Sequence, residues 1–423
     1  MVPEKRLSAR ALLVRSTLFL FIVLIAPRAR TQTYRVIYAF TGQNKLSAGS
    51  TIALDSLGNF YGASNNSVRT CSAGACGAIY KISPTGTETT LYEFAGSPDG
   101  EYPNGVMVDG TGTLYGTTYY GGTSTFQYCN NYGCGVLFRL TGSGQETVLH
   151  SFNAPPGDGI LPQAGVILGS NGALYGTTTN GGTGSVGTSG DGTIYRFANG
   201  KETVLYNFTD GVDGGLPSSS LLLRGGSLYG TANFGGTGPC FTTFGGGCGT
   251  VFRLDKTGES TLYEFQGGAD GGFPAASLIA DSAGNLYGTT VLGGDLNCEI
   301  GGPPAGCGVV FKLTRSGQET VLHTFTGSTD GAWPSNALVM DPAGNLYGTA
   351  YYGGDLQCNY GLGCGTVFKI DASGQFSVIH TFKGKEGAFP RALIAVGEKL
   401  YGVTDGGGPG GLFLTGVIYE LTP

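Results

Sequence analysis

The sequence predicts an all-β fold built from seven tandem repeats, and three observations support this prediction. A motif centred on Tyr-Gly recurs at intervals of 54 to 60 residues, which is typical of repeat architectures. Its seven Tyr residues are Tyr61, Tyr115, Tyr175, Tyr229, Tyr287, Tyr347 and Tyr401. Many of the 79 Gly residues separate short apolar, aromatic and Thr-rich runs, a pattern that indicates strands joined by turns. After residue 30, no long segment has the apolar spacing of a helix.

Each repeat is predicted to form four strands, which we name A to D in chain order. In the repeat at residues 333–383 they are expected at 336–340, 346–351, 365–370 and 376–382. The turns are rich in Asp, Asn, Ser and Gly, and the strands are rich in Val, Thr, Tyr and Phe. The middle strands carry apolar residues on both faces, which predicts sheets buried on both sides. Four-stranded antiparallel sheets repeated radially describe a β-propeller.

The two ends of the chain predict how the ring closes. The first strand, at residues 34–40, resembles a strand D without its own strands A to C. The chain ends with a strand C at residues 417–421. Seven blades are therefore expected, with the N-terminal strand completing the last blade and hiding two sheet edges. Residues 31–423 are predicted to form a single β-propeller domain.

Strand order also predicts which loops share a face. If strand A is innermost, the D–A and B–C loops lie on one face, and the A–B and C–D turns lie on the other. Nearly all length variation between repeats falls in the D–A and B–C loops. Because variable loops on a rigid scaffold commonly carry binding sites, ligands are expected on this face, which we call the loop face.

Residues 1–30 have the pattern of a signal peptide. Basic residues precede an apolar run at residues 18–26, which is short for a membrane span. The residues that follow lack a clear small-x-small cleavage site, so an uncleaved N-terminal anchor is the alternative. No later stretch is long and apolar enough to span a bilayer. The protein is therefore expected to be exported, to an extracellular, cell-surface or periplasmic location.

The charge of the remaining chain argues against two classes of partner. The whole sequence has a net charge of −6, and residues 1–30 contribute six basic residues and one acidic residue. The remainder holds 17 basic and 28 acidic residues, a net charge of −11. Nucleic acids and anionic lipid surfaces both require a basic face, so neither is an expected partner.

The ten Cys residues fall into five local pairs, each within one B–C loop. The pairs are Cys71/Cys76, Cys129/Cys134, Cys240/Cys248, Cys298/Cys307 and Cys358/Cys364. An even count, local pairing and an export signal favour disulfides. Metal binding is the competing interpretation, but the pairs lack C-x-x-C spacing and the three His residues lie on strands D. Neither a metal site nor another cofactor is therefore expected, and the disulfides are expected to order individual loops.

An acidic residue followed by Gly recurs in the D–A loops. These acids are Asp99, Asp158, Asp213, Asp270, Asp330 and Glu386. A ring of carboxylates could bind a cation or carry out acid–base chemistry on a sugar. The alternative is that each Asp-Gly pair makes a turn, with Asp accepting bonds from its own backbone. Six near-identical copies favour the turn, because catalysis needs different roles at different positions.

Aromatic residues on the loop face are the main candidates for binding. The residue before the Pro that opens strand A is Tyr102, Leu161, Leu216, Phe273, Trp333 or Phe389. Such rings could stack on sugars or anchor a partner side chain, or they could pack between neighbouring blades. Other aromatic residues lie beside the Cys pairs, which would order them before binding. The candidate binding residues are Trp333, Phe273, Tyr102, Phe389, Tyr120, Tyr352, Asp330 and Asp270.

No set of residues in the sequence identifies a catalytic centre. His150, His323 and His380 occupy one repeat position on strand D, where other repeats have Tyr. This exchange indicates a packing role with a polar tip rather than a catalytic or ligand role. The sequence contains no nucleophile elbow, phosphate-binding Gly loop or zinc helix motif. The sequence therefore favours a non-catalytic role over an enzymatic one, and no catalytic residue is assigned.

The repeat Asn-Leu-Tyr-Gly-Thr … Gly-Gly … Cys-Gly-x-Val-Phe-Lys resembles the GloVer tandem repeat of exported bacterial proteins. The best copies are residues 285–327 and 345–382, and the resemblance extends over residues 34–423. It implies export and association with the cell envelope, often through a separate C-terminal anchoring segment. No such segment follows the last strand C, so release is the alternative to surface attachment. The family implies no activity and no catalytic residues.

Three hypotheses about function remain open at this point. The first is an exported, non-catalytic binding module that recognises a glycan or an envelope protein on the loop face with its disulfide-ordered loops. The second is a polysaccharide lyase or glycoside hydrolase that uses the carboxylates of the D–A loops. The third is a structural or adhesive surface repeat. A propeller fold alone does not distinguish among them.

Overall fold

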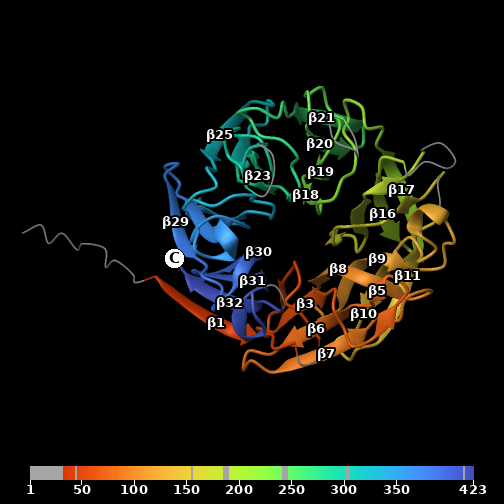
Figure 1. The fold of residues 1–423 in the computed structure, drawn as a ribbon. Helices are drawn as coiled ribbons and strands as arrows, with labels where there is room; N and C mark the ends of the chain where they lie inside the picture. The colour runs from red at the N-terminus through yellow and green to blue at the C-terminus, as the bar shows by residue number, and fades with distance from the viewer. Residues whose placement is uncertain are drawn as a thin grey trace, which may run out of the picture. The chain divides into compact units, whose positions relative to one another are not determined.

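Seven four-stranded antiparallel sheets follow one another around a ring (Figure 1). The computed structural model describes residues 32–42, 45–153, 156–183, 190–240, 246–300, 305–412 and 415–423. The expected signal segment, residues 1–30, lies outside the described residues. Within the described ranges, no helix has the length and apolar character needed to cross a bilayer.

The first four blades follow the chain order. Blade 1 contains β2 (Ala53–Leu54), β3 (Phe60–Ser64), β6 (Ala78–Ile82) and β7 (Glu88–Glu93). Blade 2 contains β8 (Gly100–Val108), β9 (Leu114–Gly121), β10 (Val136–Leu140) and β11 (Glu146–Ser151). Blade 3 contains β13 (Ile167–Leu168), β14 (Leu174–Thr178), β16 (Thr193–Ala198) and β17 (Lys201–Asn207). Blade 4 contains β18 (Leu222–Arg224), β19 (Ser227–Ala232), β20 (Thr250–Asp255) and β21 (Gly258–Glu264).

The last three blades include the closure. Blade 5 contains β22 (Ile279–Ala280), β23 (Leu286–Thr290), β24 (Val309–Leu313) and β25 (Glu319–Thr324). Blade 6 contains β26 (Val339–Met340), β27 (Leu346–Ala350), β28 (Thr366–Ile370) and β29 (Phe376–Thr381). Blade 7 contains β30 (Ala388–Val396), β31 (Lys399–Gly406), β32 (Val417–Thr422) and β1 (Thr33–Ala39). Figure 1 shows β18 and β30 on the inner side of the ring and β25 and β29 on the outer side.

Short elements lie in the loops between these strands. The two-stranded ribbons are β4 (Thr70–Cys71) with β5 (Gly74–Ala75), and β12 (Gly159–Ile160) with β15 (Asn180–Gly181). The 3-10 helices are η1 (Gln127–Cys129), η2 (Asn359–Gly361) and η3 (Gly408–Gly410).

The N-terminal strand closes the ring, as the sequence predicts. β1 pairs with β32 in antiparallel register, with Tyr34 opposite Leu421 and Ala39 opposite Val417. The Glu420 carboxylate also forms ion pairs with Arg35 (3.1 Å), on β1, and with Lys399 (3.0 Å). The seven-bladed, four-stranded architecture is therefore confirmed.

Buried aromatic pairs join neighbouring blades. At every junction a Phe just after strand D lies edge-on to an aromatic ring on strand C of the next blade, with centroids 5.0–5.4 Å apart. The pairs are Phe40–Tyr80, Phe94–Phe138, Phe152–Tyr195, Phe208–Phe252, Phe265–Phe311, Phe325–Phe368 and Phe382–Tyr419. All of these rings are buried, so the hydrophobic core runs around the whole ring between the blades.

The recurring Tyr-Gly motif fixes the A–B turn. In blade 6 the Asp341 carboxylate accepts hydrogen bonds from the Asn345 side-chain amide (2.7 Å) and from the Tyr347 hydroxyl (3.0 Å). Blades 1 and 5 contain the same pair of bonds. The next residue must be Gly, because a Cβ at Gly348 would overlap the Phe368 ring.

Strand A is shorter than the sequence predicts in blade 6. Only Val339–Met340 pair with strand B there, although a strand was expected at 336–340. The first half of this segment bonds instead to the preceding blade, where the Thr289 hydroxyl donates to the Asn336 carbonyl (3.4 Å). A binary strand pattern cannot distinguish a partner in the same sheet from one in the neighbouring sheet.

Candidate binding site on the loop face

The D–A and B–C loops lie side by side, as predicted. In blade 6 Ala332 of the D–A loop pairs with Tyr352 at the end of strand B, and Gly272 pairs with Leu292 in blade 5. In blade 3 the two loops form the β12–β15 ribbon. The variable loops therefore form one continuous face over a scaffold of regular sheets.

All five predicted disulfides are present, and together they use all ten Cys residues. The bridges are Cys71–Cys76, Cys129–Cys134, Cys240–Cys248, Cys298–Cys307 and Cys358–Cys364. Because every thiol is oxidised, the competing interpretation of the Cys pairs as metal ligands is excluded for this state of the protein.

The second Cys of each bridge is buried, which the sequence did not predict. Both Cys residues of each pair lie in a B–C loop, as expected, but Cys76, Cys134 and Cys248 are each 0% exposed. They belong to hydrophobic clusters that two neighbouring blades share. The physical reason is that the second Cys lies directly before strand C, where the chain enters the junction with the next blade. These Cys residues are therefore part of the core between blades and cannot contact a ligand on the loop face. Cys307 and Cys364 are buried to the same extent.

Each bridged loop also accepts a backbone hydrogen bond from the next blade, so it contributes to the contact between blades. The carbonyl of the second Cys accepts a backbone hydrogen bond from the residue before the Pro of the next strand A. Trp333, for example, donates to Cys307 (3.0 Å) and Phe389 donates to Cys364 (2.8 Å). Blade 3 has no disulfide, and there the Asp191 carbonyl accepts the bond. The bridges therefore order the loops at the seams between blades.

The residue before each of these Pro residues has a left-handed backbone, with φ between 53° and 60°. These residues are Tyr102, Leu161, Leu216, Phe273, Trp333 and Phe389. This conformation costs a non-Gly residue about 1–2 kcal/mol, and the backbone bond to the preceding blade compensates for part of that cost. The sequence offers no signal for it, because none of the six is Gly or Asn.

The predicted binding residues of blades 6 and 7 form one aromatic cluster. The Tyr352 ring lies 5.1 Å from the Trp333 ring and 5.9 Å from the Phe389 ring. Tyr351 completes the cluster, at 4.8 Å from Tyr352 and 5.2 Å from Phe389. Phe389 is only 4% exposed, so it supports the other rings rather than facing solvent.

The other predicted aromatic residues lie elsewhere on the loop face. Tyr102 and Tyr120 are 6.2 Å apart in blade 2, where Tyr120 also contacts Tyr119 and Tyr132. Phe273, in blade 5, contacts Phe234 at 5.4 Å. The structure thus does not bring the predicted binding residues together into one site.

The two predicted acidic binding residues are held in turns. Asp330 accepts hydrogen bonds from the His323 ring nitrogen (3.1 Å) and from the Thr326 backbone (3.0 Å). Burial opposes ionisation of Asp330, but these bonds lower its pKa. Asp270 accepts equivalent bonds from Tyr263 (3.1 Å) and Gln266 (2.8 Å).

The same arrangement recurs in the other D–A loops that contain Asp. Each of these carboxylates accepts a bond from the strand D side chain and from the backbone four or five residues before it; they are Asp99, Asp158 and Asp213. These Asp residues therefore all form the same kind of turn. None of them has the distinct surroundings that a catalytic carboxylate requires.

A set of residues that sequence analysis did not single out distinguishes blade 7 from the others. The residues after the D–A Pro are Asn104, Gln163, Ser218, Ala275, Ser335 and Arg391. The residues aligned at the end of strand B are Asn65, Tyr119, Thr179, Asn233, Val291, Tyr351 and Asp405. Blade 7 places a charged residue at both positions, where every other blade has a neutral one. Aligning the repeats would have revealed this difference.

Arg391 and Asp405 form the centre of a polar cavity. The Arg391 Nε lies 2.6 Å from the Asp405 Oδ2, and the guanidinium lies 4.5 Å from the centre of the Tyr351 ring. The Tyr351 hydroxyl donates to the same carboxylate (3.2 Å). Burial, followed by the negative charge of Asp405, raises the pKa of Tyr351 to about 12, so its hydroxyl remains a donor at neutral pH.

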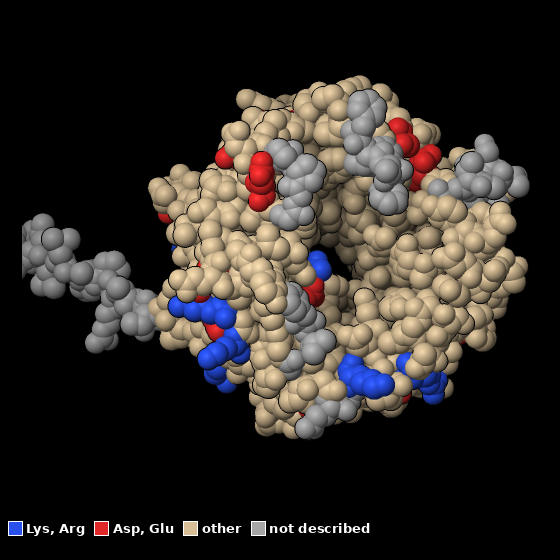
Figure 2. Space-filling view, in the orientation of Figure 1, with Lys and Arg blue, Asp and Glu red and all other residues tan. Residues whose placement is uncertain are grey.

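The cavity has a volume of about 410 Å³ and lies between blades 7 and 1. Its lining consists of Ser47, Gly49, Ser50, Asn65, Asn66, Arg391 and Asp405. The side chains of Arg391 and Asp405 are 31% and 26% exposed, so both can reach a ligand. Figure 2 shows the ring hollowed at its centre, with a blue and a red patch meeting at the edge of the opening.

The residues of this cavity favour binding over hydrolysis. Arg391 has five N–H donors, of which Asp405 engages one, and the Asn and Ser side chains add donors and acceptors. A glycoside hydrolase needs two carboxylates on either side of the bond that breaks. Among the described residues, the cavity lining contains one, Asp405.

A second cavity, of about 470 Å³, lies between blades 4 and 5. Arg224, Arg253 and Arg315 contribute to its lining. Two of these side chains already have partners, since Arg224 donates to the Ser282 carbonyl (3.0 Å) and Arg253 pairs with Asp255. Arg224 therefore serves mainly as a contact between blades.

Comparison with solved structures finds distant similarity. The extracellular domain of a putative one-component system from B. thetaiotaomicron is 12% identical, with a TM-score of 0.50. The match covers 92% of this chain and 39% of that one. A gluconolactonase from Xanthomonas campestris is 11% identical with a TM-score of 0.42, covering 92% of this chain and 89% of that one. At these identities the likeness concerns the fold alone. No curated protein matches the sequence significantly.

The repeats themselves identify the family. The sequence matches the Gloeobacter/Verrucomicrobia repeat over residues 23–244 and again over residues 240–419. Together the two matches span nearly all of the described propeller. The chain belongs to the Gloeobacter/Verrucomicrobia repeat family.

Proposed function

We propose that this protein is an exported, non-catalytic module that binds a neutral polysaccharide segment at the cavity between blades 7 and 1. The observation that carries the proposal is the Arg391–Asp405–Tyr351 group, whose two charged members occupy repeat positions that are neutral elsewhere. Arg391 and Asp405 are not needed for a blade to fold, because the six other blades fold with neutral residues at these positions. Their presence at a solvent-accessible cavity therefore favours a role in binding.

The chemistry of the cavity suits sugar hydroxyl groups. A carboxylate, a guanidinium and two side-chain amides can each make paired hydrogen bonds to neighbouring hydroxyls. Arg391 and Asp405 neutralise each other, so the cavity itself does not select for a charged ligand. The acidic balance of the chain further disfavours a polyanion, which favours a neutral glycan.

The aromatic cluster beside the cavity would extend the binding surface. Trp333 and Tyr352 are partly exposed and are held by the buried Phe389 and by the Cys307 and Cys364 loops. Rings that are already ordered lose little conformational entropy on binding, which favours their use as stacking platforms. They would contact sugar units next to the one in the cavity.

The five disulfides indicate an oxidising environment. We further propose that residues 1–30 direct export, and that the protein acts outside the cell, on its surface or in the periplasm.

Retention on polysaccharides tests the proposal. Full-length protein is incubated with cellulose, chitin, xylan, starch and peptidoglycan, and both protein retention and soluble sugar release are measured. We expect retention on at least one polymer without release of products. The double variant Arg391→Ser, Asp405→Asn should lose retention, and both replacements occur at these positions in other blades, which favours folding.

Two controls separate the elements of the proposal. An Arg315→Ser variant removes a charge outside the cavity and should bind normally. A Trp333→Ala, Tyr352→Ala variant should bind longer polymers more weakly. Undiminished retention in the Arg391→Ser, Asp405→Asn variant would refute the location, and release of oligosaccharides would refute the non-catalytic role.

A further inference from the structure

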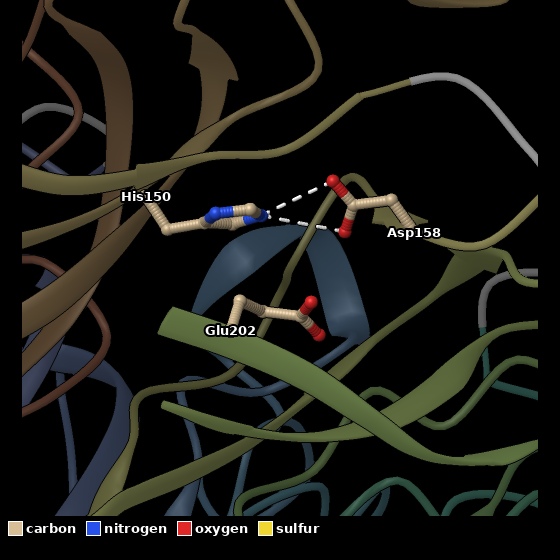
Figure 3. Close-up of side chains that lie close together, drawn as sticks. All are labelled: His150, Asp158 and Glu202. Carbon is tan, nitrogen blue, oxygen red and sulfur yellow. Dashed lines mark hydrogen bonds and ion pairs between the residues drawn. The ribbon is translucent and has the colours of Figure 1, made fainter. Parts of the chain in front are cut away.

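Three side chains with metal-binding groups converge at the junction of blades 2 and 3. His150 lies on β11, Asp158 in the D–A loop that follows it, and Glu202 on β17 of the next blade (Figure 3). The His150 Nε2 is 3.1 Å from one Asp158 oxygen and 3.4 Å from the other. One ligand atom from each of the three residues lies within 4.8 Å of the other two.

The repeat positions of this trio have other residues at most junctions. Three junctions keep the two acids but have Tyr in place of His, and the Tyr hydroxyl donates to the Asp. These trios are Tyr92/Asp99/Glu146, Tyr206/Asp213/Glu259 and Tyr263/Asp270/Glu319. A protonated phenol is a poor metal ligand, so these junctions lack the nitrogen donor.

The two other His junctions lack the second acid. Phe376 occupies the Glu position beside His323 and stacks on its ring at 3.5 Å. Tyr34 occupies the Glu position beside His380, and the centres of these two stacked rings are 4.0 Å apart. In the described part of the chain, the junction of blades 2 and 3 alone combines an imidazole with two carboxylates.

The His150 and Asp158 side chains already have the spacing of two ligands of one ion. A tetrahedral ion bound at about 2.1 Å separates its ligand atoms by about 3.4 Å, close to the His150–Asp158 distance. The Asp158 carboxylate is oriented by the backbone N–H groups of Asn153 (2.9 Å) and Gly159 (2.8 Å). The His150 ring is held edge-on against Phe152 at 4.9 Å. Such supporting contacts are typical of metal sites.

The Glu202 side chain offers a carboxylate oxygen that is free to bind an ion. Its Oε1 is buried and has no hydrogen-bond partner among the described residues. Glu146 and Glu319 have the same unpaired oxygen, but the strand D residue at their junctions is Tyr rather than His. The His150 and Asp158 side chains are 22% and 14% exposed, which leaves access for an ion and a water ligand.

We propose that His150, Asp158 and Glu202 bind one divalent transition-metal ion of the Zn²⁺ type, which links blades 2 and 3. One imidazole and two carboxylates with a water are a donor set for such ions. No metal was expected from the sequence, because exchange with Tyr indicated a packing role for the His residues. The ion would join β11 to β17 beside blade 3, whose B–C loop has no Cys.

Metal titration of the full-length, untagged protein tests the proposal. Zn²⁺ binding is measured by calorimetry after chelator treatment, and Co²⁺ is used as a spectroscopic substitute whose visible absorption reports its ligands. We expect one equivalent to bind. His150→Tyr, which installs the residue that most other junctions have, should weaken binding by about 100-fold or more. Glu202→Phe, which copies the blade 6 residue, should have a similar effect.

A matched control is available in the same chain. His323→Tyr removes an imidazole from the equivalent position of blade 5 and should leave the affinity unchanged. Circular dichroism checks that each variant is folded. Failure of the wild-type protein to bind Zn²⁺, unchanged affinity in His150→Tyr, or an equal loss in His323→Tyr would each overturn the proposal.

Discussion

The junctions between blades and the cavity between blades 7 and 1 differ in how closely their residues follow the repeat. At the junctions, the Phe after strand D meets the same kind of ring seven times, with nearly constant spacing. At the cavity, Arg391 and Asp405 replace residues that are neutral in every other blade. Repetition marks what every blade needs in order to pack, and a departure marks what one blade does alone. Mutations at the two kinds of position should therefore differ in kind.

Truncating a junction ring should have the largest effect on stability. Phe325→Ala removes a fully buried ring that lies 5.3 Å from Phe368. Loss of a buried Phe side chain, with the cavity that it leaves, costs about 3–5 kcal/mol. We expect a decrease of that size in the free energy of unfolding, measured with urea. An effect below about 1 kcal/mol would show that the junction rings do not carry the ring's stability.

Opening one disulfide should have a smaller and more local effect. The chain-entropy relation gives about 2 kcal/mol for a loop as short as Cys358–Cys364, and Cys358→Ser, Cys364→Ser should lose that much. The Phe389 N–H, which bonds to the Cys364 carbonyl, should exchange faster with solvent. Hydrogen exchange measures this directly. Loss of the far-UV β signal would instead mean that the bridge holds the blade together.

The fold was predictable from the sequence because its repeats are visible there. The pairing of β1 with β32 followed from a strand D at one end of the chain and a missing one at the other. The disulfides followed from local spacing, and the D–A acids behave as turn residues. These features depend on short stretches of chain or on counting repeats, which a single sequence contains.

The sites were harder to predict because they depend on contacts between blades. Glu202 meets His150 from a neighbouring repeat, and Tyr351 meets Arg391 across the junction of blades 6 and 7. Strand patterns specify which face of a sheet a residue occupies, but not which residue of the next sheet lies opposite. The burial of Cys76 and the left-handed backbone at Trp333 were missed for the same reason, because both arise where one blade meets the next.

The pH dependence of stability should also reflect repeated positions, because an acid that recurs in four blades causes most of it. Burial, followed by the negative charge of a neighbouring Asp, raises the pKa of the Glu at the start of strand D to about 7 in blades 2 to 5. The residues are Glu146, Glu202, Glu259 and Glu319. A raised pKa means that the folded protein binds the proton more tightly than the unfolded chain. Their contribution is therefore full below about pH 4.5 and is lost as the pH rises to about 7.

Each of these acids is only about half-buried, so solvent screening reduces its effect to about 1 kcal/mol. His380 acts in the opposite direction, because burial, followed by Lys383, lowers its pKa to about 4 and its protonation destabilises the fold below pH 6.5. We expect the four acids to dominate in metal-free protein, so the unfolding free energy should decrease by about 2–4 kcal/mol between about pH 5 and pH 8. Glu319→Gln should flatten this slope by about one quarter. An unchanged slope would remove Glu319 from the explanation.

Removing the charges of the cavity should have the smallest effect on stability and the clearest effect on function. Arg391 and Asp405 are partly exposed, and pairs of this kind contribute about 0–1 kcal/mol to folding. The Arg391→Ser, Asp405→Asn variant should therefore unfold at nearly the same urea concentration as the wild type while losing its retention on polysaccharide. Measuring the free energy of unfolding and retention on the same preparations separates the two quantities. Parallel losses would place this pair among the residues that hold the ring together, and the distinction between repeated and departing positions would then fail at the site where it matters most.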